Sequence, residues 1–311
     1  MLAQQIIENW DTSAKGYAAE IIMLFEVGYP AWTIKTNEVY GVAIPLPDNV
    51  EVAEKFSGAK LYNDIIELNG QKENVLLLVT ELEDIKYPFA TLCAELITPG
   101  DAGILRREVE ENPVNWWKQW KELLGNKNID ERVYDVLGEL YTLRYLAKRG
   151  RMAIWNGPNS ATYDIECDCM YYEVKSTMAR EKRQITLNNH FQLDPPDGKE
   201  LKLILCQFEV AQTGYNIDSL VDELTQYGYS KQDLNQKLEV LGFEKRNSAR
   251  KRCYMLHAMI EYDVDDKFPA IRESSFVGGV LPKGVQTITY TISLDGVSGE
   301  KIENSEYDDG I

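Results

Sequence analysis

Alternation of apolar and polar positions dominates the first hundred residues of the chain. Turn-forming Gly, Pro, Asn and Asp separate the alternating runs, as expected for the short strands of a sheet. The strands predicted in this way cover residues 39–47, 61–69, 74–82 and 89–98. Apolar spacing before them predicts a helix around residues 18–25. Together these patterns predict a β-rich N-terminal domain over residues 1–112.

Helical periodicity replaces this alternation over the next fifty residues. Residues 105–124 form the first predicted helix, in which Pro113 can occupy a first helical turn. Three tryptophans in it have a spacing that more often marks core packing than a platform for bases: Trp116, Trp117 and Trp120. A second helix is predicted over residues 130–149, where Gly150 ends an apolar stripe formed by Val133, Val136, Leu137, Leu140, Leu143 and Leu146.

Three short strands are predicted after this helix, and a mixture of elements follows them. The short strands cover residues 152–155, 161–168 and 170–177. The later elements are a buried strand at 201–211, helices at 217–228 and 231–242, strands at 253–264 and 284–297, and a frayed acidic tail. The predicted fold class is α+β or α/β. It places a helix on a mixed central sheet over residues 113–212, with a C-terminal α/β extension over residues 213–311.

The amino-acid composition restricts the compartment, the cross-links and the metal ligands that are expected for this protein. Hydrophobic residues make up 44% of the 311 residues, which is ample for a core. The N-terminus lacks the pattern of a signal peptide, and no run approaches the ~18 apolar residues of a membrane span, so we expect a cytoplasmic protein without membrane contact. Five cysteines and two histidines favour neither a disulfide framework nor a zinc cluster. Carboxylates would therefore hold any metal, which favours Mg²⁺, with Mn²⁺ able to replace it.

The charge distribution decides whether nucleic acid is a plausible partner. The net charge of −17 argues against it at first, because a polyanion prefers a basic surface. Residues 1–125 carry 10 Lys and Arg against 20 Asp and Glu, whereas residues 126–294 carry 22 against 24. A basic run from Arg144 to Arg151 lies in this balanced part. Two more runs are candidates for phosphate contacts, with a solvated charged surface as the alternative: Arg180, Lys182 and Arg183, and then Lys245, Arg246, Arg250, Lys251 and Arg252.

One group of charged residues stands out by its place on two predicted strands. The period of a strand puts Glu173 and Lys175 on one face of residues 170–177. Acidic residues alternate along the preceding strand, beginning with Asp164. If the two strands pair as a tight hairpin, a carboxylate of the first lies beside Glu173. Glu139 is on the helix that precedes them, and Gly138 would let this helix approach the strands closely.

This grouping suits the hydrolysis of a phosphodiester bond. Asp164, Glu173 and the Val174 carbonyl could hold Mg²⁺, and Lys175 could orient the attacking water and stabilise charge on the phosphate. Glu139 could take a second metal or fix the lysine. Three other acid-x-lysine triplets, at residues 84–86, 197–199 and 265–267, lack this setting of paired strands and a preceding helix. The alternative is a surface ion pair on a half-exposed hairpin.

At these residues the chain resembles the PD-(D/E)XK nuclease superfamily, and more narrowly a prokaryotic family found in restriction and phage-defence gene clusters. The resemblance covers roughly residues 88–210, including LGELYTL, WNGPNSATYDIE, YYEVKST and QITLNNHFQL. It implies a restriction-endonuclease-like core whose active site is Glu139, Asp164, Glu173 and Lys175. A glutamine beyond the lysine often completes such sites, and Gln192, or less favourably Gln184, would match it. Tyr163 replaces the proline of the family pattern.

The resemblance implies a Mg²⁺-dependent DNA endonuclease of a restriction or anti-phage system. Its expected partners are DNA and separate subunits, such as a methyltransferase or a helicase-like ATPase, and a homodimer is open. The strong acidity is compatible with this, since such a nuclease would bind DNA weakly until a partner delivered it. A catalytically silent module that binds nucleic acid or a protein is the alternative, although such a module is expected to lose a member of the quartet. An RNA-processing nuclease is a third candidate.

Overall fold

The computed structural model divides the chain into two compact units. It describes residues 2–13, 17–56, 58–83, 85–123, 128–159, 162–195, 198–279, 281–285 and 287–302. Unit 1 consists of Met1–Lys127 and Glu244–Ser248, and unit 2 of Asn128–Phe243 and Ala249–Ile311. The first boundary therefore falls after residue 127 and not after residue 112. The predicted core and the predicted C-terminal extension form one unit, because their strands share a sheet.

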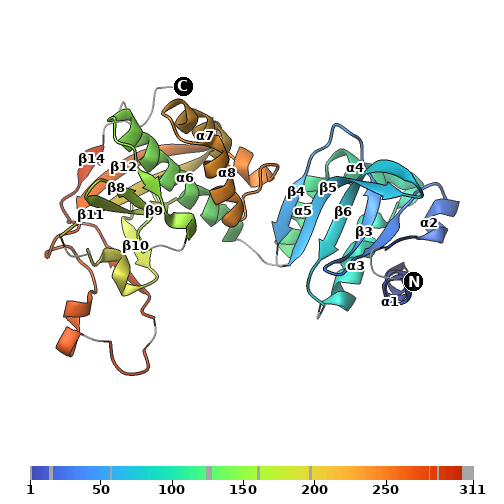
Figure 1. The fold of residues 1–311 in the computed structure, drawn as a ribbon, viewed down its shortest axis with the longest axis horizontal. Coiled ribbons are helices and arrows are strands. Elements are labelled where there is room, and N and C mark those ends of the chain that lie inside the picture. The colour runs from blue at the N-terminus through green and yellow to red at the C-terminus, as the bar shows by residue number, and fades with distance from the viewer. Residues whose placement is uncertain are drawn as a thin grey trace. The chain divides into compact units, whose positions relative to one another are not determined.

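Unit 1 is built on an antiparallel six-stranded sheet with the order β1-β2-β3-β6-β5-β4 (Figure 1). Its strands are β1 (Tyr17–Glu20), β2 (Trp32–Lys35), β3 (Tyr40–Pro45), β4 (Ala53–Phe56), β5 (Ala59–Leu68) and β6 (Gln71–Thr80). The predicted strands at 39–47, 61–69 and 74–82 correspond to β3, β5 and β6. At residues 18–25, where a helix is predicted, the structure has β1 followed by the short helix α2 (Ile22–Glu26).

Four longer helices accompany this sheet: α1 (Leu2–Thr12), α3 (Lys86–Ile97), α4 (Ile104–Glu111) and α5 (Pro113–Leu123). The strand predicted at 89–98 is wrong, because this segment is α3. Its buried residues follow helical spacing: Phe89, Ala90, Cys93, Leu96 and Ile97. They pack with α1 and with one face of the sheet in a single apolar cluster. The apolar residues of this segment therefore follow the 3.6-residue period of a helix and not the two-residue period of a strand.

The predicted helix at 105–124 is two helices. Asn112 is the C-cap of α4, and Pro113 begins α5, where a missing backbone N–H costs nothing. Trp117 is fully buried in the cluster under the sheet, whereas Trp116 packs against the edge of that cluster and Trp120 is half-buried. One of the three tryptophans is thus a full core residue.

Unit 2 contains a mixed six-stranded sheet with the order β14-β12-β11-β9-β8-β7. Its strands are β7 (Ile154–Trp155), β8 (Ile165–Cys167), β9 (Met170–Thr177), β11 (Glu200–Tyr215), β12 (Tyr254–Asp263) and β14 (Glu300–Ile302). Only the β9–β11 pair is parallel. A separate two-stranded ribbon pairs β10 (Gln184–Leu187) with β13 (Tyr290–Ser293). The strand predicted at 284–297 is thus much shorter, and residues 303–311 of the predicted frayed tail lie outside the described residues.

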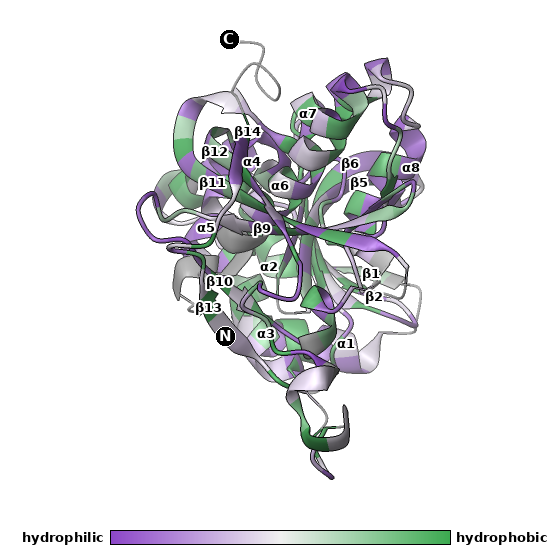
Figure 2. Ribbon diagram, turned by 90° about the vertical axis from the view of Figure 1, so that its left-hand side faces the viewer, coloured by the Kyte–Doolittle hydropathy of each residue, from purple (hydrophilic) through white to green (hydrophobic). Residues whose placement is uncertain are grey.

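Helix α6 (Asn128–Lys148) packs on this sheet, as Figure 1 shows. A Cβ on Gly138 would overlap the Ser176 hydroxyl and lie 3.3 Å from Val174 Cγ1, so only glycine permits this approach. Helices α7 (Ile217–Gln226) and α8 (Lys231–Val240) join the same core. Hydrophobic and polar segments alternate along α7 in Figure 2, as its buried residues Ile217, Leu220, Val221 and Leu224 require.

The fold is therefore α+β, with a helix on a mixed sheet in the part of the chain where this arrangement is predicted. Among the described residues, no helix is both long enough and apolar enough to cross a membrane.

Candidate active site

A tight hairpin forms the centre of the candidate site. Strands β8 and β9 pair antiparallel, with Cys167 opposite Met170, so only Asp168 and Cys169 lie in the turn. Asp168 has a φ of 55°, a left-handed conformation that aspartate tolerates better than most residues. This register continues toward Asp164, just before β8, and Glu173 on β9. The predicted hairpin is confirmed.

Asp164 and Glu173 lie next to each other at the end of this hairpin. One carboxylate oxygen of Asp164 accepts a hydrogen bond of 2.7 Å from the backbone N–H of Val174. The Glu173 side chain is 1% exposed, and its Oε1 lies 2.8 Å from Lys175 Nζ. Glu173 Oε2 is buried and has no hydrogen-bond partner among the residues that the structure describes. One oxygen of a fully buried carboxylate is therefore free to take a ligand.

A second bond to Glu173 comes from beyond the lysine. Gln192 Nε2 donates to Glu173 Oε1 at 2.7 Å, and the Gln192 side-chain oxygen accepts from the backbone N–H of Asn188 at 2.8 Å. Gln192 lies in a 3-10 helix (His190–Leu193) that Asn189 caps through two backbone N–H groups. Gln184, the less favoured candidate, is exposed on β10. The structure thus brings Gln192 to the predicted quartet.

The carboxylate of Glu139 extends from α6 toward the loop between β7 and β8. It accepts a hydrogen bond from the indole N–H of Trp155. A Cβ on Gly157 would overlap this carboxylate. The backbone N–H of Gly157 donates to the Asp164 carbonyl at 3.0 Å, so the same loop joins Glu139 to Asp164. Sequence reasoning missed Trp155 and Gly157, because their only signal is the motif WNGPNSATYDIE as a whole.

Burial and mutual repulsion strongly disfavour ionisation of these carboxylates. Burial, then the neighbouring Asp164, raise the pKa of Glu173 to about 8. Burial, then Asp164, raise the pKa of Glu139 well above its usual range. Burial also raises the pKa of Asp164, although Lys175 and the Val174 N–H oppose this shift. The positive charge near Glu139, Asp164 and Glu173 is therefore too small to keep all three carboxylates ionised.

Lys175 is the cation that faces this group. Burial lowers the pKa of Lys175, but Glu173 and Asp164 outweigh burial and hold it above its ordinary value. The ammonium is therefore charged at neutral pH. Asp135, one helical turn before Glu139, acts on both Glu139 and Lys175 and was not predicted. It is exposed, so the site reaches the surface on this side.

The donor set fits a hard divalent cation. The unpartnered Glu173 oxygen and the neighbouring Asp164 carboxylate are oxygen ligands of the kind that Mg²⁺ and Mn²⁺ take. Within the described ranges, no three His, Cys, Asp or Glu side chains converge closely enough to hold a metal by themselves. Two carboxylates with a backbone carbonyl and water are thus the set that these residues offer.

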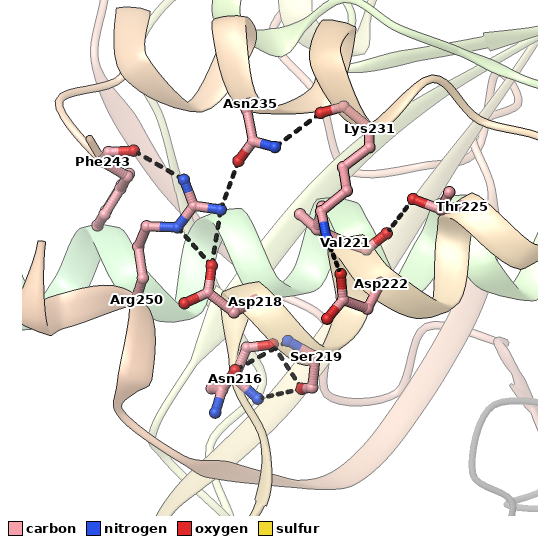
Figure 3. Close-up of polar contacts among 10 residues, drawn as sticks. All are labelled: Asn216, Asp218, Ser219, Val221, Asp222, Thr225, Lys231, Asn235, Phe243 and Arg250. Carbon is pink, nitrogen blue, oxygen red and sulfur yellow. Dashed lines mark hydrogen bonds and ion pairs between the residues drawn. The ribbon is translucent and has the colours of Figure 1, made fainter. Parts of the chain in front are cut away.

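Arg250 does not belong to a phosphate-binding surface, which corrects part of the prediction for residues 245–252. Its side chain is 1% exposed and its guanidinium pairs with Asp218 at 2.7 and 2.8 Å (Figure 3). It also donates to Asn235 at 2.7 Å and to the Phe243 carbonyl at 3.3 Å. A guanidinium with all these partners holds α7, α8 and the chain after them together. Arg144 of the first basic run is likewise buried, paired with Glu223 at 2.5 Å.

The other basic residues between positions 245 and 252 are divided between the two units. Lys245 and Arg246 belong to unit 1, where Arg246 donates to the side chain of Asn63 at 3.0 Å. Lys251 and Arg252 belong to unit 2, with Lys251 exposed and Arg252 half-buried. The five residues therefore do not form one basic surface on one unit.

The loop after β9 carries the remaining basic candidates. Arg180, Lys182 and Arg183 are exposed, and Arg180 forms an ion pair with Glu209. Gln207 of β11 anchors this loop by donating to the carbonyls of Ala179 and Arg180 at 2.9 and 3.1 Å. Arg180, the first of these basic residues, lies three residues after the end of the strand that bears Glu173 and Lys175. The loop is thus a fixed basic segment attached directly to the site strand.

Tyr163 occupies the position where the family pattern has proline. Its hydroxyl donates to the Asp194 carbonyl at 2.5 Å, and its ring lies 4.9 Å from that of Tyr171. Burial, then Asp194, raise its pKa to about 12. Tyr163 thus ties the Asp164 strand to the end of the 3-10 helix that carries Gln192. The departure from the pattern supports the site instead of disrupting it.

A helix glutamate, a strand aspartate and an E-x-K pair meeting on a mixed sheet define the PD-(D/E)XK class of nuclease-like folds. A family model described as "Putative PD-(D/E)XK family member, (DUF4420)" matches residues 32–295, and the chain belongs to this family. The match includes most of unit 1 as well as the site. The comparisons find no match among curated proteins and none among solved structures.

Proposed function

We propose that this protein is a divalent-metal-dependent endonuclease that hydrolyses phosphodiester bonds of DNA. The observation that carries the proposal is the buried oxygen of Glu173, which has no hydrogen-bond partner in the described part of the chain. It lies in a group of three carboxylates that the Lys175 ammonium faces. A buried carboxylate that is incompletely paired costs folding free energy, so its retention favours a ligand-binding role.

The chain supplies a defined set of groups for this reaction. Asp164, Glu173 and the Val174 carbonyl would hold Mg²⁺ or Mn²⁺, with Glu139 serving a second ion or the water. The bound metal would polarise the scissile phosphate and lower the pKa of the attacking water. The Lys175 ammonium, held 2.8 Å from Glu173, orients that water and offsets the negative charge that develops on the phosphate. Gln192 fixes Glu173 from the other side.

Substrate contact is the part of the reaction for which the chain is least equipped. Its net charge is −17, and the buried arginines of unit 2 are already paired. Arg180, Lys182 and Arg183 are the basic residues attached to the site strand. We therefore propose that they touch the DNA backbone, and that partner subunits of a restriction or anti-phage system, such as a methyltransferase or helicase-like ATPase, deliver the substrate.

The direct test is a cleavage assay on the purified full chain. Supercoiled plasmid, modified phage DNA and an RNA of matched sequence are incubated with Mg²⁺ or Mn²⁺, with and without the products of neighbouring genes. We expect nicked or linear DNA only when metal is present, and none from Glu173→Gln. Identical products from wild type and Glu173→Gln would show that a contaminant cuts, and RNA cleaved in preference to DNA would overturn the assigned substrate.

The basic loop has its own test. Replacing Lys182 and Arg183 with alanine should weaken DNA binding and flatten its salt dependence by up to ~0.9 log unit per lost phosphate contact. Lys245→Ala is the matched control, because Lys245 is equally exposed but lies in unit 1. If the loop variant and the control have the same salt slope, the loop is only a solvated surface.

A further inference from the structure

Unit 1 has a groove that the proposed nuclease reaction does not use. It has a volume of about 260 Å³ and lies between α3, α4 and α5. Two tryptophans, two glutamates and several side-chain amides line it, among them Trp116, Trp120, Glu95, Glu108 and Asn115. All these residues are within unit 1, so the groove is complete without any other part of the chain.

The tryptophans of the groove are distinct from the tryptophan of the core. Trp116 and Trp120 are four residues apart and therefore share one face of α5, whereas Trp117 points into the apolar cluster. Their ring centroids are 5.9 Å apart with an angle of 47° between the planes. This tilt prevents the rings from stacking flat on each other. Both remain partly accessible, so aromatic surface lines the groove.

The charged groups that line the groove are two glutamates. In the described part of the chain, neither Glu95 nor Glu108 has an ion-pair partner, and no cation lies over the ring of Trp116 or Trp120. Residues 1–125 carry 20 Asp and Glu against 10 Lys and Arg. This charge repels phosphates, so a nucleotide or a nucleic-acid backbone is a poor ligand for the groove. A cation is attracted by both the carboxylates and the indole faces.

We propose that this groove binds an arginine side chain of a partner protein. A guanidinium is flat enough to stack on an indole, and its five N–H donors match carboxylate and amide oxygens at the edge. Leu105, which lines the groove, is an apolar side chain with 45% exposure. Such a side chain can pack against a residue next to an arginine in a peptide, and it adds no favourable contact for a small free cation.

The test follows the indole N–H signals of the full-length protein by NMR during titration with a peptide that has one central arginine. Six tryptophans give six signals, and we expect those of Trp116 and Trp120 to shift while Trp10, Trp32, Trp117 and Trp155 do not. The matched peptide with citrulline, which is neutral and nearly the same shape, should cause no saturable shift. Trp120→Ala should weaken binding about threefold to tenfold.

The carboxylates are tested by a matched pair on one helix. Glu108→Gln should weaken binding of the arginine peptide, whereas Glu111→Gln, an exposed position of α4 outside the groove, should leave it unchanged. Equal shifts from the citrulline peptide, or agmatine binding more tightly than the peptide, would overturn the proposal. So would a nucleoside that shifts the two indoles more than the arginine peptide does. None of these readouts depends on cleavage, so the proposal stands or fails separately from the nuclease.

Discussion

Arg250 and Glu173 are both buried charged residues of unit 2, and they differ in how completely their polar groups are paired. Arg250 is 1% exposed and satisfies its guanidinium with Asp218, Asn235 and the Phe243 carbonyl. Glu173 is as deeply buried, but one of its oxygens has no hydrogen-bond partner within the described ranges. The residues around Arg250 cancel its charge, whereas the acids around Glu173 add to its charge.

How completely a buried charged group is paired distinguishes a structural residue from a functional one better than its residue type does. A buried ion pair with every donor satisfied fixes the fold, and breaking it leaves an uncompensated charge. A buried carboxylate with like-charged neighbours is unfavourable until a cation arrives. Sequence alone presents both as charged residues in charged segments. The following changes test whether the two groups really behave in opposite ways.

Removing the guanidinium of Arg250 should have the largest effect on stability. Arg250→Ala leaves the buried Phe243 carbonyl and the partly buried Asp218 and Asn235 side chains without their donor, so we expect the free energy of unfolding to fall by about 2–4 kcal/mol. Urea denaturation followed by circular dichroism measures this. Lys251→Ala, at the exposed neighbouring position, should change it by less than about 0.5 kcal/mol. Equal effects from the two variants would remove the structural role assigned to Arg250.

Removing the ammonium of Lys175 should affect activity strongly and stability little, in contrast to Arg250→Ala. Lys175→Ala should lower the cleavage rate by ~10² to 10³, because one electrostatic group is lost from the transition state, while the fold stays intact. Metal binding by calorimetry should persist, unlike in Glu173→Ala. Lys199→Ala is the control, since Lys199 also pairs with a strand carboxylate, Glu166, but outside the site. Full activity of Lys175→Ala in a folded protein would leave the silent binding module as the better account.

The pH dependence of stability should reveal the unpaired carboxylate. The folded-state pKa of Glu173 is about 8 against an ordinary 4.5, so the folded protein keeps a proton that the unfolded chain releases between these values. Stability of the metal-free protein should therefore decline as pH rises from about 4.5 to about 8. Glu173→Gln should flatten the decline, and Mg²⁺ should offset it. A flat wild-type profile would contradict the raised pKa.

The smallest of these effects is expected at Gly157. A Cβ there overlaps the Glu139 carboxylate, so Gly157→Ala should displace this group and slow cleavage about tenfold. Trp155→Phe, which removes the indole N–H that binds the same carboxylate, should act in the same direction. The Gly157→Ala and Glu139→Ala changes should be less than additive when combined. Full additivity would mean that Gly157 does not act through Glu139.

Local periodicity along the chain is sufficient to predict part of the site. A two-residue period fixes Glu173 and Lys175 on one strand face, and a two-residue turn fixes the β8–β9 register. The apolar stripe of α6 and the small Gly138 likewise place the helix against the strand. Each of these follows from residues near one another in the chain.

Which charged groups are paired depends on contacts between residues far apart in the chain, and periodicity does not predict these contacts. Gln192 reaches Glu173 across 19 residues, and Arg250 reaches Asp218 across 32. Residues 89–97, which belong to a predicted strand, are helical because α1 and the sheet of unit 1 bury one apolar face of α3. The physical reason is common to all three cases: the free energy of a charge or an apolar face depends on what surrounds it, and those surroundings come from distant parts of the chain.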